Sequence, residues 1–113
     1  MREGTGLALD RMRYQRVAPE RARVDEVSAR AQQHWDVIDE AGATIARAEV
    51  FEGREQWGVR LLDRAPHMHD SDLIRVVAHL LVWHAQCRTE TVDVVLARSH
   101  EHHTLVRVSG DYV

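Results

Sequence analysis

The chain of 113 residues contains no lysine, no asparagine and one cysteine, Cys87. A single cysteine cannot form a disulfide within the chain, which favours a reducing compartment, so we expect a cytoplasmic protein. No apolar run approaches the roughly 20 residues that a membrane-spanning helix needs. The first residues also lack the apolar centre of a signal peptide. These absences predict a protein that is neither exported nor embedded in a membrane.

Because lysine is absent, all 15 basic residues are arginines, as is typical of a high-GC genome. The arginine content is therefore no argument for phosphate binding, although guanidinium groups suit that role. The net charge is −3, whereas nucleic-acid-binding proteins normally carry a concentrated basic surface. Only two short segments are basic enough, residues 20–23 and residues 11–16, which contain Arg11, Arg13 and Arg16. A nucleic-acid-associated regulator that uses these arginines is an alternative that the charge does not favour.

The sequence contains no nucleophile elbow, no P-loop and no dinucleotide-binding glycine motif. Its strand–strand–helix–strand portion is similar to acyl-CoA-dependent N-acetyltransferases, but residues 63–70 read DRAPHMHD. The glycine-rich pyrophosphate turn of that family is therefore missing, and we reject this interpretation. The element order is also similar to that of type III secretion chaperones, which bind protein segments as dimers, although no motif is shared. We expect a non-enzymatic protein without an organic cofactor.

The hydrophobic pattern predicts an α+β protein with two layers, in the order α-β-β-β-α-β-β, and a five-stranded, mainly antiparallel sheet. Residues 1–18 are expected to form a tail or a short helix, and residues 19–113 a single domain. Within it we expect a helix over 19–33, strands over 34–39, 43–51 and 55–63, a helix from Asp72, and a final hairpin whose strands flank the turn HEHH.

The alternation of apolar residues along the strands predicts which sheet face the second helix covers. That face comprises Trp35, Val37, Ala46, Ala48, Val50, Trp57, Val59, Leu61, Val92, Val94, Leu96, Val106 and Val108. The opposite face also has apolar positions, whereas a sheet face open to water would be polar. These positions are Ile38, Ile45, Phe51, Leu62, Val95 and Leu105. The N-terminal helix, a second subunit or another protein must cover them.

The second helix is apolar around most of its circumference, which is typical of a helix buried on more than one side. Our leading hypothesis is therefore a protein-interaction module that binds itself as a homodimer, or another protein. Its expected interaction surface consists of Ile38, Phe51, Leu62, Val95, Leu105 and Trp83. On an ideal helix His79 and His84 are about 140° apart, so they should not share a metal ion. We expect His84 in the core and Cys87 as a small buried side chain.

The other histidines are expected to meet at one end of the sheet. A right-handed crossover through the second helix makes the strand that follows it parallel to the strand that precedes it. This arrangement brings the loop after residue 63 beside the HEHH turn. The residues gathered there are His67, His69, His100, His102 and His103. They predict either a solvated rim, a transition-metal site, or a surface that responds to pH. A metal-binding protein is thus the second functional hypothesis.

Overall fold

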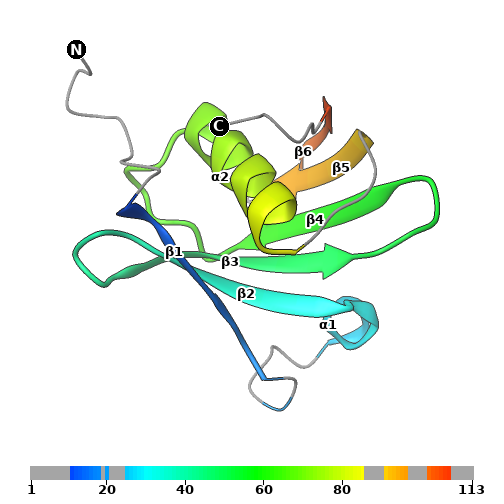
Figure 1. Cartoon of the computed structure of the whole chain (residues 1–113), viewed down its shortest axis with the longest axis horizontal. Coiled ribbons are helices and arrows are strands. Elements are labelled where there is room, and N and C mark those ends of the chain that lie inside the picture. The colour runs from blue at the N-terminus through cyan, green and yellow to red at the C-terminus, as the bar shows by residue number, and fades with distance from the viewer. Residues whose placement is uncertain (1–10, 19, 21–24, 86–90, 97–101, 108–113) are drawn as a thin grey trace.

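The computed structural model describes residues 11–18, 20, 25–85, 91–96 and 102–107, with the side chains of residues 96 and 102–107 left out of the description. Its elements are β1 (Arg13–Arg16), α1 (Glu26–Arg30), β2 (Gln33–Ile38), β3 (Thr44–Phe51), β4 (Trp57–Leu62), α2 (Asp70–Trp83), β5 (Thr91–Leu96) and β6 (His102–Arg107). The strands form one sheet in the order β1-β2-β3-β4-β5-β6 (Figure 1). The α+β class and the mainly antiparallel sheet are confirmed, and β1 adds a sixth strand at the edge.

The only parallel pair among the described strands is β4 with β5, and α2 connects the two. Trp57 lies opposite Val92 and Leu61 opposite Leu96, so both strands end at the same edge of the sheet. This pairing confirms the expected crossover. The other neighbouring strands are antiparallel.

Helix α2 begins at Asp70, two residues before the expected start. Asp70 and Asp72 place carboxylates in the first turn, where they interact favourably with the helix dipole. The guanidinium of Arg64 contacts the Asp70 carboxylate and ties the preceding loop to this end of the helix. The helix ends at Trp83, and His84 follows with φ −122° and ψ −43°. Helical geometry therefore does not extend to His84.

The core lies between α2 and one face of the sheet, and the alternation of apolar residues predicted that face correctly. Ten of the expected positions are buried in it: Trp35, Val37, Ala46, Ala48, Val50, Trp57, Val59, Leu61, Val92 and Val94. The side chains of Leu96 and Val106, and residue Val108, lie outside the described part of the chain. Ile45 was expected on the opposite face but joins this core. A bulge between Val37 and Ile38 shifts the register there, so simple alternation fails at that point.

The N-terminal third differs from the prediction. Residues 13–16 form strand β1 instead of a tail or a short helix, and β1 pairs with β2. The expected helix over 19–33 is limited to Glu26–Arg30 among the described residues, and Gln33 already belongs to β2. Residues 19 and 21–24 lie outside the described ranges. Asp25 caps α1 by accepting a hydrogen bond from the Ser28 amide, which fixes where the helix begins.

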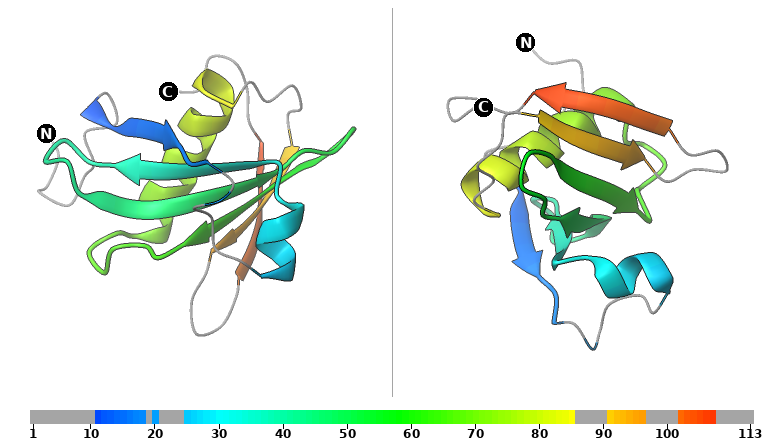
Figure 2. Two further views of the ribbon diagram at one scale, coloured as in Figure 1. Left: turned by 90° about the horizontal axis from the view of Figure 1, so that it is seen from below. Right: turned by 90° about the vertical axis from the view of Figure 1, so that its right-hand side faces the viewer.

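Helix α1 packs on the sheet face opposite α2, as Figure 2 shows. Glu49 of β3, only 1% exposed, accepts a hydrogen bond from the Ser28 hydroxyl. The His34 ring lies 3.9 Å from the Glu49 carboxylate. The Arg60 guanidinium lies 3.7 Å from the Glu49 carboxylate and 3.9 Å from that of Asp25. These five residues form the buried ionic cluster. Part of the second face is thus polar and covered by α1, whereas the prediction took account only of its apolar positions.

Candidate interaction surface

Four ring side chains gather where the C-terminal end of α2 meets the edge strand β1. We call Tyr14, His79, Trp83 and His84 the aromatic patch. The Tyr14 ring centroid lies 4.7 Å from that of His84 and 5.6 Å from that of His79, and the centroids of His79 and Trp83 are 6.4 Å apart. Beneath them lies the buried indole of Trp35, 6.2 Å from the His84 ring. These contacts hold β1 against α2.

The two histidines of the patch are closer than the helical projection predicted. Their ring centroids are 6.0 Å apart. Because the helix ends at Trp83, His84 does not follow the 100° step of an α-helix, and its ring lies back beside Tyr14 and His79. His84 is also exposed overall, not buried in the core as expected. Both errors came from extending the helix past its last residue.

Trp83 is the only large apolar side chain that is strongly exposed in the described part of the chain, at 55%. It was among the residues expected in an interaction surface. Tryptophan is the residue type most enriched in the energetic centres of protein interfaces, because it buries a large area with little loss of conformational entropy. An exposed tryptophan beside three further rings is therefore the strongest surface feature of the described residues.

Burial affects the ionisation of the patch. Loss of hydration raises the pKa of the Tyr14 phenol, which stays neutral at physiological pH. Desolvation lowers the pKa of His79, and the nearby His84 lowers it further. Desolvation also lowers the pKa of His84. The Tyr14 hydroxyl and the His79 Nδ1 atom are buried without a hydrogen-bond partner among the described residues. At neutral pH the patch is thus uncharged.

Beside the patch, the outer edge of β1 offers backbone hydrogen-bonding groups. The Val17 amide donates to the His34 carbonyl over 2.7 Å. In an antiparallel ladder the direction of the peptide groups alternates along the strand. Gln15 therefore directs its groups toward β2, whereas Tyr14 and Arg16 direct theirs away from the sheet. As β1 is the last strand on this side, no described strand pairs with those groups.

The remaining residues of the expected interaction surface lie elsewhere. Ile38 and Leu62 are buried within the chain, and Phe51 and Val95 are half-buried on the second face. The Leu105 side chain lies outside the described part. Phe51 lines an open pocket of about 310 Å³ together with Glu52, Gly53, Gln56, Trp57, Gly58 and Asp93. The second face thus has a shallow hollow at β3–β5 rather than a continuous apolar surface.

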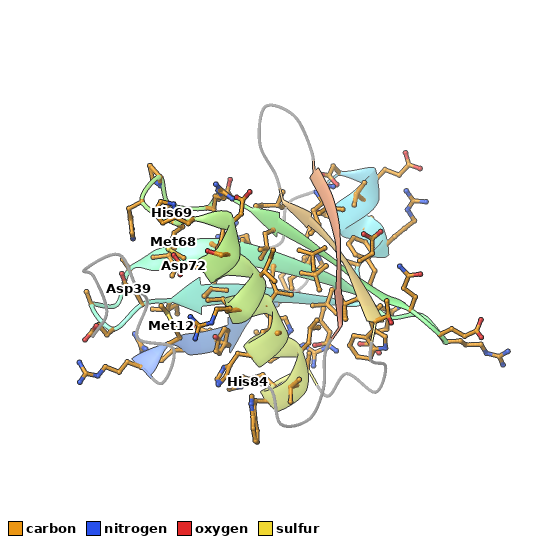
Figure 3. The ribbon with its side chains drawn as sticks, turned by 90° about the horizontal axis from the view of Figure 1, so that it is seen from above. Met12, Asp39, Met68, His69, Asp72 and His84 are labelled. Carbon is orange, nitrogen blue, oxygen red and sulfur yellow. The ribbon has the colours of Figure 1, made fainter. Side chains whose placement is uncertain are left out.

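The expected histidine rim lies at the opposite end of α2 from the aromatic patch, as the positions of His69 and His84 show in Figure 3. His67 and His69 are exposed, with the buried Met68 between them. His102 and His103 are the first residues of β6, and His102 lies opposite Leu96. His100 is outside the described residues. Within the residues described, no three His, Cys, Asp or Glu side chains form a group that could hold a metal ion.

The N-terminal arginines do not form one continuous basic surface. Arg11 makes an exposed ion pair with Glu40 at 2.9 Å, which fastens the start of β1 to the β2–β3 turn. Arg13 and Arg16 are exposed and lie on opposite faces of β1, since strand side chains alternate. Tyr14, the centre of the patch, was not identified from the sequence. The available signal was the alternation of Met12 and Tyr14 with arginines over a short segment.

No helix within the described ranges is long and apolar enough to cross a membrane. No protein-family model, no curated protein sequence and no solved structure matches the chain significantly.

Proposed function

We propose that the protein is a small non-enzymatic interaction module that associates with a second copy of itself through the aromatic patch and the outer edge of β1. The single observation that carries this proposal is Trp83, 55% exposed beside a strand edge that no described strand covers. Association through a strand edge uses backbone hydrogen bonds and contacts between side chains. The outer edge of β1 offers the first, and the exposed indole of Trp83 the second.

The charge state of the patch supports association. The lowered pKa values of His79 and His84 leave both imidazoles uncharged near neutral pH, and the Tyr14 phenol is neutral as well. Desolvating neutral rings costs much less free energy than desolvating charges. We expect Arg16 of β1 and Arg75 of α2, which are close in sequence to Tyr14 and His79, to supply a polar rim. An aromatic centre with a polar rim is the usual composition of a protein interface.

We expect Trp83→Ala to weaken self-association about thirty-fold, which corresponds to the roughly 2 kcal/mol of a hot-spot residue. Sedimentation equilibrium from about 1 to about 100 μM measures the dissociation constant. Phe51→Ala is the matched control, because Phe51 is an aromatic residue on the other sheet face. A wild-type chain that stays monomeric over this range contradicts the proposal. A larger effect of Phe51→Ala would instead place the interface on the second face.

A metal-binding function at the histidine rim is a second candidate, favoured by one observation. Strands β4 and β5 are parallel, so they end at the same sheet edge. His102, the first residue of β6, lies opposite Leu96 at this edge, and the loop with His67 and His69 leaves β4 there. Imidazoles from these two segments are suitable ligands for Zn²⁺ or Ni²⁺.

For this candidate we expect untagged protein to bind about one Zn²⁺ per chain with micromolar affinity by calorimetric titration, and the His67→Ala/His102→Ala variant to lose that binding. The matched control is His79→Ala/His84→Ala, which removes the two histidines at the other end of α2. Absence of heat with wild-type protein, or equal loss in both double variants, contradicts a metal site at the rim.

A further inference from the structure

The geometry of β1 points to one mode of self-association, and this inference rests on the proposed function. We infer that two copies pair their β1 strands antiparallel about a two-fold axis at Gln15, so that Tyr14 of each copy lies opposite Arg16 of the other. The sheets of the two chains would then become continuous. Both the peptide groups and the side chains of β1 favour this arrangement.

The backbone restricts the possible registers. Only Tyr14 and Arg16 direct their N–H and C=O groups outward from β1, and residues that face each other in a hydrogen-bonded pair must both do so. Three symmetric registers bring such residues together: Tyr14 with Tyr14, Arg16 with Arg16, and Tyr14 with Arg16. The last uses the outward groups of both residues on both chains, which gives four backbone hydrogen bonds within β1. In each of the other two registers, only one residue of β1 forms a hydrogen-bonded pair with its counterpart in the second copy.

The side chains favour the same register. Pairing Arg16 with Arg16 would place like charges directly opposite each other, which is destabilising. The register that pairs Tyr14 with Arg16 avoids such contacts, because Gln15 then faces Gln15 and Arg13 faces Val17. Tyr14 and Arg16 share one face of β1, so the guanidinium of one copy can lie over the phenol ring of the other. The partner copy thereby contributes a cation to each aromatic patch.

The symmetry also accounts for the position of Trp83. A two-fold axis perpendicular to the sheet keeps both copies of α2 on the same face. Tyr14 contacts His79 and His84 near the end of α2, so both helix ends lie close to the axis. The two aromatic patches would then flank the β1–β1 junction and extend a four-residue strand contact into a larger interface. A strand of four residues alone offers little stability.

The experiment is a cross-link at the axis. In the predicted register the Gln15 residues form a pair without mutual hydrogen bonds, whose Cα atoms lie about 4.5 Å apart, within disulfide range. We expect Gln15→Cys, in a Cys87→Ser background, to give a covalent dimer for most of the protein under a mild glutathione redox buffer. The matched control is Arg13→Cys, also exposed and on the same face of β1. Its two copies would be separated by several residues along the strands, too far to bridge.

The outcomes separate this inference from the proposed function. Cross-linking by Gln15→Cys, with only background dimer for Arg13→Cys, supports the register. Preferential cross-linking by Tyr14→Cys would overturn it in favour of the register centred on Tyr14. If the wild type is dimeric and Trp83→Ala weakens the dimer, yet none of the three cysteine variants of β1 cross-links, the patch mediates association and the inferred strand pairing is wrong. A wild type that is monomeric at about 100 μM removes both.

Discussion

Replacing Glu49 by alanine is expected to lower the free energy of unfolding by about 3–5 kcal/mol, as is typical when one partner of a buried ion pair is removed. The Glu49 side chain is 1% exposed and lies among Ser28, His34 and Arg60. Its removal leaves the Arg60 charge, which is itself mostly buried, without its closest carboxylate. It also removes the acceptor of the Ser28 hydroxyl, so α1 loses one of its two polar contacts through Ser28 and keeps the one between the Ser28 carbonyl and the His34 ring.

Urea unfolding followed by tryptophan fluorescence measures this loss. Asp36→Ala is the matched control, since Asp36 pairs with Arg47 on the same sheet face at 3.0 Å but is more exposed. A partly exposed pair of this kind contributes about 0–1 kcal/mol. Glu49→Gln should fall between the two, because the amide can still accept from Ser28 without the charge. Equal losses for Glu49→Ala and Asp36→Ala would show that the buried ionic cluster does not hold α1.

Lowering the pH from about 7.5 to about 5 should weaken self-association by about tenfold and reduce the free energy of unfolding. The ordinary pKa of histidine is 6.5, and folding lowers the pKa of both His79 and His84. Below pH 6.5 the unfolded chain therefore takes up protons before the folded chain does. The free energy of unfolding that these histidines contribute above pH 6.5 is therefore lost as the pH falls through their lower pKa values in the folded chain. Two imidazolium charges would also face each other and the partner's Arg16.

The groups around these histidines offer little compensation for the added charge. Tyr14, Trp35 and Trp83 are neutral, and Arg75 precedes His79 by one helical turn. In the residues that the structure describes, no carboxylate forms an ion pair with either ring. The measurement is sedimentation equilibrium and urea unfolding at both pH values. The His79→Gln/His84→Gln variant should lose most of the pH dependence of association and stability, whereas His67→Gln/His69→Gln should keep it. The reverse pattern would assign the pH dependence to the histidine rim.

The alternation of apolar and polar residues predicted the helix-covered face of the sheet well, because the direction of a side chain along a strand depends on local sequence alone. Val92 and Val94, like Trp57 and Val59, alternate with more polar residues, and a period of two fixes the direction of each side chain. The parallel pairing of β4 and β5 followed from the length of α2 and the known handedness of crossovers. The end of the sheet at which the histidine-bearing segments lie could therefore be predicted.

The aromatic patch could not be predicted in the same way, because it depends on contacts between distant segments. Strand β1 has four residues and becomes a strand through its pairing with β2. The His84 ring approaches that of His79 only because α2 ends at Trp83, one residue before His84. Periodicity determines the end of a helix poorly. On the second face, counting apolar residues alone concealed the charged side chains between them, which explain why α1 binds there.

The single parallel pair among the described strands has a consequence for how the chain folds. Strands β2, β3 and β4 are joined by short turns, and β5 and β6 follow each other directly, so each group can form from contacts that are local in sequence. The β4–β5 ladder is different, because the whole of α2 and its flanking segments must be enclosed before the first hydrogen bond between the strands can form. The entropy of that closure is lost before its contacts are gained, so docking of the β5–β6 hairpin should be the slow step. Substitutions at Val92 or Val94 would then mainly speed unfolding, while those within β2–β4 would slow folding.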